Sequence, residues 1–368
     1  MTAWTHTGFA QQIRFGSGVL DDVAGIVRDA GGRRLLLVTT EGRLASPDGE
    51  RLVKVLGREL ASTFAGVQSH VPAPAVQAAV QQARRDGVDA VVSFGGGSCA
   101  DLAKAVCYFT EREAGTPGAT WLDRPALPHV AIPTTYSGAE LTPFFGMTDP
   151  ASRRKSGGGG PTIAPVAAVY DPDLTVSTPA RVSAETGMNA LAHCVECAYS
   201  ITRTPEAEAV ALAGARRIAS SLPAVVDDPI DLLARTHMLA GAVLGGRALQ
   251  NAAMGVHHGL AQLVGGRTGI SHGLANAVIL AHAMRFNAGA VPEDMRRIGE
   301  ALGDPDDPAG AVDRLLQRIG LPARLSDVGV TDEDLDAIVR LSQSSYSVQS
   351  NPRPVSEDDA RSILEAAF

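Results

Sequence analysis

The segment "DAVVSFGGGSCADLAKAVCYF" (residues 89–109) joins a short apolar run to three successive glycines and then to a stretch without helix breakers. This pattern predicts a buried strand that ends in a glycine turn and continues into a helix. Glycines let backbone N–H groups approach a phosphate closely, and the helix start adds the positive end of its dipole. We therefore predict a phosphate-binding turn formed by Gly95, Gly96 and Gly97.

Two polar residues follow this turn. Ser98 is a good N-cap for the helix, and Asp101 stands three residues later, in the capping-box position. The turn matches neither the Walker A sequence nor G-x-G-x-x-G. An ordinary strand–helix connection is therefore the alternative to a phosphate site.

The rest of the first half also alternates strands and helices. Apolar runs predict strands over the segment 89–97 and at 33–40, 62–69, 129–135 and 165–171, and helical stretches at 49–61, 75–88 and 98–109. Continuous apolar strands that alternate with helices are typical of a parallel sheet covered on both faces. Ligands of such folds bind at the carboxyl ends of the strands.

After about residue 175 the pattern becomes helical. Ala- and Leu-rich stretches are found at 182–201, 206–222, 229–263 and 273–288, and shorter ones at 293–302, 309–319, 332–344 and 356–367. We predict an α/β domain over residues 1–163 and an all-helical domain over 164–368. The stretch "SGGGGP" (156–161) reads as a flexible loop near their junction.

Composition excludes several classes of function. The net charge of -8 argues against a nucleic-acid surface, although a local basic cluster could still bind a small anionic substrate. No apolar run reaches the length of roughly 18–20 residues that a membrane span needs. Four cysteines are too few for a disulfide framework, so we expect a cytoplasmic protein.

Polar side chains follow two of the other predicted strands. Thr134, Thr135 and Tyr136 form a hydroxyl cluster that suits the ribose or amide of a nucleotide, and a polar loop with local turn bonds is the alternative. Thr40 ends the first strand, where folds selective for NAD usually place Asp or Glu. Since Thr40 carries no charge and Glu41 comes one residue later, both NADH and NADPH stay possible.

A basic stretch precedes the glycine loop. Arg154 and Lys155, with Arg153 before them, could close over a carboxylate or phosphate of the substrate. A solvated basic loop is the alternative.

The helical half holds a candidate cluster of histidines. Asn189 and His193 stand four residues apart without a helix breaker, so a helix places both on one face. His257, His258 and His272 follow in similar apolar surroundings. A lone histidine of this kind is usually a core residue, but several recur here beside glycine turns, so we predict a functional site.

Ordered motifs along almost the whole chain resemble the iron-containing (group III) alcohol dehydrogenase superfamily. They include "RFGSG", "GGGSCADLAKA", "IPTTYSGAE", "NALAH", "HHGLAQLVGG", "SHGLANAVILAH" and "NPRPVS". The resemblance implies a Rossmann-like α/β dinucleotide-binding domain over residues 1–163, an all-helical substrate and catalytic domain over 164–368, and usually a homodimer. It also implies a cofactor site made of Gly95, Gly96, Gly97 and Ser98 at the diphosphate, Asp101 and Lys104 close by, and Thr134 and Thr135 at the nucleotide.

The resemblance raises the question of a metal. Metal-dependent members bind iron or zinc through an Asp, a His one helical turn later, and two further His. The matching positions here are Asn189, His193, His258 and His272. A neutral amide is a weak partner for a dication, so we expect no functional metal. Zinc held by the three histidines is the alternative.

Within the superfamily, "GMNALAH" and "TPFFGMTD" look most like the maleylacetate reductase branch. That branch uses NADH or NADPH to reduce the C=C bond of maleylacetate to 3-oxoadipate in the breakdown of aromatic compounds. By this resemblance we expect Asn189, His193, His258 and His272 to be catalytic. Tyr136, His257, Gln262, Arg154 and Lys155 are the expected substrate contacts.

The chain departs from the branch pattern in two places. Gln262 stands where a second histidine is usual, and "SHGLAN" (271–276) replaces an acidic segment. A different substrate is therefore possible. A metal-dependent alcohol dehydrogenase or aldehyde reductase, and a non-catalytic dinucleotide-binding relative, are the two alternative functions.

Overall fold

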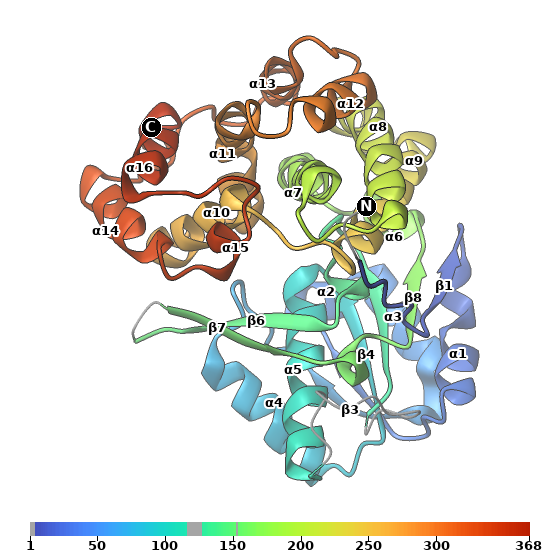
Figure 1. Cartoon of the computed structure of the whole chain (residues 1–368). Helices are drawn as coiled ribbons and strands as arrows, with labels where there is room; N and C mark the ends of the chain where they lie inside the picture. Colours follow the sequence, from blue (N-terminus) through green and yellow to red (C-terminus); the bar gives the residue numbers. More distant parts are fainter. Residues whose placement is uncertain (1–3, 116–126, 152–153) are drawn as a thin grey trace. The chain divides into compact units, whose positions relative to one another are not determined.

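A computed structural model describes residues 4–115, 127–151 and 154–368 of the chain (Figure 1). The chain forms two compact units, an α/β unit over Gly8–Thr178 and a helical unit over Pro179–Phe368 that also includes residues 4–7. The boundary is not between residues 163 and 164 as predicted. Strand β8 (Ala167–Tyr170) pairs with β5 (His129–Pro133), so the α/β unit must extend past it.

The described part of the α/β unit contains a parallel six-stranded sheet in the order β1-β8-β5-β4-β2-β3. The predicted strands correspond to β5, β8 and three more, β2 (Leu35–Val38), β3 (Leu60–Phe64) and β4 (Ala90–Gly95). The prediction of a parallel sheet is confirmed. Edge strand β1 (Gln12–Phe15) is missing from the predictions because all four of its residues are exposed and only two are apolar.

Helices cover both faces of the sheet. Successive side chains of a strand point to opposite faces, so neighbouring residues pack against different helices. Leu36 packs in one apolar cluster with residues of α4 (Ala73–Arg85) and α5 (Gly97–Glu113). Leu37 packs in another with residues of α1 (Val23–Asp29) and α3 (Pro47–Leu56). The glycine turn between β4 and α5 therefore lies at the carboxyl edge of a central strand.

The predicted flexible loop is wrong. Strand β6 (Phe144–Asp149) and strand β7 (Arg154–Gly159) form an antiparallel hairpin through the stretch. Its glycines serve close packing, since a Cβ on Gly157 would lie 2.2 Å from the Phe145 carbonyl oxygen and one on Gly158 would lie 2.8 Å from the Tyr108 ring.

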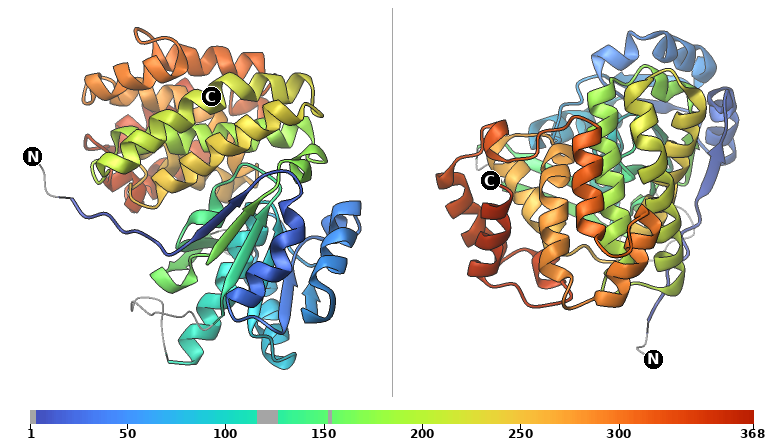
Figure 2. Two further views of the ribbon diagram at one scale, coloured as in Figure 1. Left: turned by 90° about the vertical axis from the view of Figure 1, so that its right-hand side faces the viewer. Right: turned by 90° about the horizontal axis from the view of Figure 1, so that it is seen from above.

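The helical unit has no strand in its described residues. Its helices are α7 (Ala180–Tyr199), α8 (Pro205–Asp227), α9 (Leu232–Leu249), α10 (Val256–Thr268), α11 (His272–Asn287), α12 (Pro292–Leu302), α13 (Pro308–Arg318), α14 (Asp332–Ser342), α15 (Tyr346–Gln349) and α16 (Glu357–Ala366). Helices α7, α8 and α9 pack side by side (Figure 2), and α7 also contacts α11.

The predicted helical stretch 229–263 is in fact two helices, α9 and α10. The segment between them ends at Gly255, where a Cβ would lie 2.8 Å from Glu196 Oε1. The break between the two helices lets the backbone of Gly255 approach this carboxylate closely.

Helix α8 is long and apolar enough to cross a membrane by length and composition alone, which the sequence reading did not single out. It packs against α7, α9 and α12, as a helix of a folded helical unit does.

Candidate active site

The carboxyl end of β4 and the start of α5 form the predicted glycine turn. Gly95 has a φ of +144°, and a Cβ there would lie 2.6 Å from Cys99 Sγ. A Cβ on Gly97 would lie 3.0 Å from the Ser137 side chain. The φ of Gly95 favours glycine, and a Cβ at Gly97 would require the Ser137 side chain to move. The turn therefore brings the chain closely into the N-terminus of a long helix, whose first backbone N–H groups have no partner within the helix.

Helix α5 begins one residue earlier than expected. Gly96 is its N-cap and no side chain caps it, so the predicted N-cap role of Ser98 is wrong. The glycines let the chain turn into the helix at Gly97, which places Ser98 in the first helical turn. Ser98 is half-buried there, next to the backbone N–H groups that suit a phosphate.

Two threonines beside the turn support a nucleotide site. The Thr134 N–H donates to the Gly95 carbonyl at 2.9 Å, which ties the two loops together. Among the described residues, the buried hydroxyl oxygens of Thr134 and Thr135 have no hydrogen-bond partner. Buried polar atoms are almost always paired, so these two hydroxyls fit contacts to a cofactor.

Asp101 and Lys104 have structural partners. Lys104 is fully buried, and its ammonium donates to the Ala139 carbonyl at 2.8 Å and to Thr142 Oγ1 at 2.8 Å. It also forms an ion pair with Asp101, whose carboxylate lies 2.8 Å away. Both residues therefore attach α5 to the loop after β5 and stabilise the helix that follows the glycine turn.

Thr40 lies just past β2, as predicted for the adenosine side of a dinucleotide. Its hydroxyl caps the short helix α2 (Glu41–Leu44) by accepting from the Arg43 N–H at 3.2 Å.

Tyr136 is fully buried in the α/β unit, which favours a packing role over the predicted substrate contact.

Three other predicted substrate residues are left untested by the side chains that the structure describes. Arg154 and Lys155 begin β7, but their side chains lie outside the described part of the chain, as does Arg153. Gln262 is exposed on α10, one helical turn after His258. Their substrate roles stay predictions.

The structure brings the predicted histidines of the helical unit together. His193 of α7 stacks on His258 of α10, with ring centroids 4.8 Å apart and planes 18° from parallel. The His272 ring, at the first residue of α11, lies 5.8 Å from that of His258. Asn189 and His193 are each only 6% exposed, so three helices converge on a nearly enclosed cluster.

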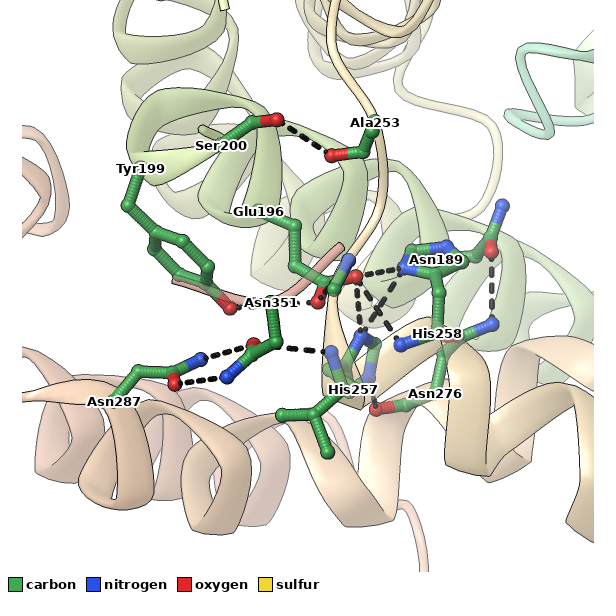
Figure 3. Close-up of polar contacts among 12 residues, drawn as sticks. Asn189, Glu196, Tyr199, Ser200, Ala253, His257, His258, Asn276, Asn287 and Asn351 are labelled. Atoms are coloured by element: carbon green, nitrogen blue, oxygen red, sulfur yellow. Dashed lines mark hydrogen bonds and ion pairs between the residues drawn. The ribbon is translucent and has the colours of Figure 1, made fainter. Parts of the chain in front are cut away.

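The sequence analysis did not identify Glu196, which pairs with His258 of this cluster (Figure 3). It is fully buried on the same face of α7 as Asn189 and His193. Its carboxylate lies 2.5 Å from His258 Nδ1 and accepts from the backbone N–H groups of Gly255 at 2.9 Å and His258 at 3.1 Å. The available signal was a single charged residue in the apolar stretch "ALAHCVECAYS", seven residues after Asn189.

His257 belongs to the same network and does not face the substrate as predicted. It is fully buried, and its Nε2 lies 2.9 Å from the Asn276 carbonyl oxygen. Its Nδ1 lies 3.2 Å from His258 Nδ1 and 3.4 Å from the nearer Glu196 oxygen. Both ring nitrogens are therefore occupied within the protein.

Asn276 fixes the orientation of the Asn189 amide. Its Nδ2 donates to the His272 carbonyl at 2.8 Å, so this atom must be the nitrogen of the Asn276 amide. The same Nδ2 donates to Asn189 at 2.9 Å, so the atom of Asn189 that faces it must be the oxygen.

Burial and hydrogen bonding set the charge states in this cluster. Burial by itself would raise the pKa of Glu196, but the hydrogen bonds from His257 and His258 outweigh it and hold that pKa well below its usual range. Burial, and second the nearby His258, lower the pKa of His193 well below its ordinary value. Glu196 is therefore an anion and His193 is neutral at neutral pH.

The donor set does not fit the metal that the resemblance raises. The position of the anionic ligand holds Asn189, whose oxygen already accepts from Asn276. Among the described residues, the group of three ligand side chains whose atoms lie within 4.8 Å of one another is Glu196, His257 and His258. Those atoms bond to each other, and the 2.5 Å between Glu196 and His258 Nδ1 is a hydrogen-bond distance.

Known proteins match this chain along almost its whole length. The family model of iron-containing alcohol dehydrogenases matches residues 10–172, and the C-terminal model of the same family matches residues 183–368. A maleylacetate reductase of Burkholderia cepacia is 34% identical, over 100% of this chain and 98% of that protein.

Solved structures show the same fold over the full chain. A maleylacetate reductase of Agrobacterium tumefaciens is 32% identical, with a TM-score of 0.88, over 100% of this chain and 99% of that one. A sulfoacetaldehyde reductase of Bifidobacterium kashiwanohense, solved in complex with NAD+, is 26% identical, with a TM-score of 0.88, over 100% and 99% of the two chains.

Proposed function

Because the chain belongs to the iron-containing alcohol dehydrogenase family of oxidoreductases, we propose that it is a maleylacetate reductase that uses NADH or NADPH. The substrate is a 2-ene-4-oxo dicarboxylate and the product is 3-oxoadipate. When bound, the reduced nicotinamide supplies a hydride to the alkene carbon β to the oxo group. The neighbouring carbon takes a proton, and the oxo oxygen carries negative charge in the enolate between the two steps.

The observation that carries the proposal is the amide of Asn189 among the three histidines. A carboxylate at this place would repel a dicarboxylate substrate, whereas an amide has no charge and can donate hydrogen bonds. Asn276 holds that amide in one orientation. Asn189 and the three histidines carry no negative charge, so they suit an anionic substrate better than they suit a cation.

The residues of the chain then have distinct tasks. His193, His258 and His272 stabilise the enolate oxygen by hydrogen bonds, and one of them returns the proton to carbon. Asn189 orients the substrate. The glycine turn with Thr134 and Thr135 holds the cofactor, and Arg154 and Lys155 bind a carboxylate of the substrate.

We propose that this chemistry needs no metal, because hydrogen-bond donors take the place of a Lewis acid. The test is to treat the purified protein with a chelator, dialyse it, measure its metal content, and assay it. Full activity with metal far below one equivalent per chain supports the proposal. Activity that is lost and returns with iron or zinc would instead establish the metal-dependent alternative.

The direct test of function is oxidation of NADH and of NADPH that depends on added maleylacetate. Turnover with either cofactor supports the assignment. Turnover of simple alcohols or aldehydes but not of maleylacetate would favour an alcohol dehydrogenase or aldehyde reductase. Cofactor binding without turnover of any enoate, ketone or alcohol would favour a non-catalytic role.

We also propose that the protein is a cytoplasmic homodimer, as its resemblance to the family implies. Edge strand β1 supports this, since Ile13 and Phe15 are both more than a third exposed and a sheet edge of this kind can pair with another chain. Sedimentation equilibrium would measure twice the mass of the chain. A monomer at micromolar concentration would contradict it.

A further inference from the structure

The surroundings of Glu196 define which atom of His258 carries a proton. We propose that Glu196 is a positioning residue that fixes His258 as the tautomer protonated on Nδ1, so that His258 presents Nε2 to the substrate. The role in catalysis rests on the proposed function, whereas the tautomer itself can be measured without it.

The carboxylate of Glu196 determines which ring nitrogen of His258 is protonated. An ionised carboxylate can only accept hydrogen bonds, so His258 Nδ1, 2.5 Å from Glu196, must carry a proton. The backbone N–H of His258 donates to the same oxygen at 3.1 Å. Ring and backbone are thus held by one acceptor, which fixes the side-chain orientation as well as the tautomer.

His257 holds the other side of the same carboxylate. Its Nε2 lies 2.9 Å from the Asn276 carbonyl oxygen, which can only accept, so this nitrogen carries a proton. Its Nδ1 lies 3.4 Å from the same Glu196 oxygen and 3.2 Å from His258 Nδ1. The rings of His257 and His258 are therefore both fixed by their contacts with Glu196.

A purely structural role for Glu196 predicts different behaviour. Glu196 accepts from the N–H groups of Gly255 and His258, at the N-terminus of α10, and therefore also acts as a cap for that helix. Asn351 gives a matched control, because its Oδ1 accepts from the neighbouring Val256 N–H at 3.1 Å and the side chain is likewise buried. Loss of Asn351 weakens the same helix start without removing a bond to a histidine ring.

The tautomer is measured on the wild-type protein with 15N-labelled histidine. Long-range 1H–15N spectra distinguish a protonated Nδ1 from a protonated Nε2, and His258→Gln assigns the signal. We expect His258 to carry its proton on Nδ1 in the wild type. A wild-type His258 with an unprotonated Nδ1 would overturn the proposal, whatever the variants do.

Kinetics test whether Glu196 acts through His258. Glu196→Gln places an N–H2 group against donors, so we expect kcat to fall by about tenfold to 100-fold. In a His258→Gln background, the same change should cost less than about twofold, because the residue it positions is already gone. Asn351→Ala should lower the melting temperature to a similar degree and change kcat by less than about twofold.

The outcomes separate the two proposals. If the wild type does not reduce maleylacetate, the proposed function fails while the His258 spectrum still decides the tautomer. If the wild type is active but Glu196→Gln and His258→Gln lower kcat independently, or if Asn351→Ala lowers kcat as much as Glu196→Gln, then Glu196 is only a helix cap.

Discussion

Asn276 of α11 donates a hydrogen bond to the side-chain oxygen of Asn189 of α7, with 2.9 Å between the two atoms. Asn189 is the position where the donor set departs from the metal-dependent pattern. The hydrogen bond connects it to α11, the helix that carries His272. Because of this hydrogen bond, the Asn189 amide is fixed in one orientation.

Restoring the carboxylate should restore metal affinity and harm the reaction. In Asn189→Asp, Asn276 can still donate to the new side chain, so the helices stay in place while the three imidazoles gain an anionic partner. We expect close to one equivalent of zinc after dialysis, measured by inductively coupled plasma mass spectrometry. We also expect kcat/KM for maleylacetate to fall by at least about tenfold, since ~1.4 kcal/mol of charge repulsion is enough.

Asn189→Ala is the matched control for that variant, because it removes the amide without adding charge. It should lower activity and retain no zinc. An Asn189→Asp protein that retains no metal and keeps full activity would show that the residue at this position decides neither property.

The order of strands and helices could be predicted because it follows from apolar periodicity, and the glycine turn from three glycines after an apolar strand. Glu196 could not, because its role depends on contacts with Gly255 and His258, about 60 residues away in the sequence. The hairpin of β6 and β7 also escaped prediction. Glycine-rich sequence signals flexibility when read locally, while here the glycines allow close packing against Phe145 and Tyr108.

Cofactor choice should depend on charge at Thr40. In Thr40→Asp the side chain can still cap α2, since Asp is a good N-cap, but it adds a carboxylate where NAD-selective folds carry one. We expect kcat/KM with NADPH to fall by at least about tenfold relative to NADH. Thr40→Asn keeps the cap and a similar size without the charge, and should leave the ratio near that of the wild type. An equal loss with both cofactors in Thr40→Asp would place the adenosine ribose elsewhere.

Lys104 should matter for stability more than for cofactor contact. Lys104→Met leaves Asp101 without its ion-pair partner and the carbonyl of Ala139 without a donor, so we expect a loss of about 3–5 kcal/mol in the free energy of unfolding. Urea unfolding followed by circular dichroism measures it. Lys54→Met, on the exposed side of α3, is the control and should change stability by less than about 0.5 kcal/mol. A stable Lys104→Met protein with weak NAD(P)H binding would instead make Lys104 a direct cofactor ligand.

His129 should make the protein less stable in mild acid. Burial, and second the nearby Lys104, lower the pKa of His129 from 6.5 to about 3, so the folded protein keeps this ring neutral beside Ser93, 2.7 Å away. Between these two pH values the unfolded chain binds a proton that the folded chain does not, so stability falls as the pH falls. From pH 6.5 to pH 4 the loss should be about 3 kcal/mol from this residue.

His129→Gln should therefore lose that much less stability over the same range in urea unfolding, whereas His237→Gln, on the exposed side of α9, should follow the wild type. Parallel pH curves for His129→Gln and the wild type would show that His129 does not resist protonation in the folded protein.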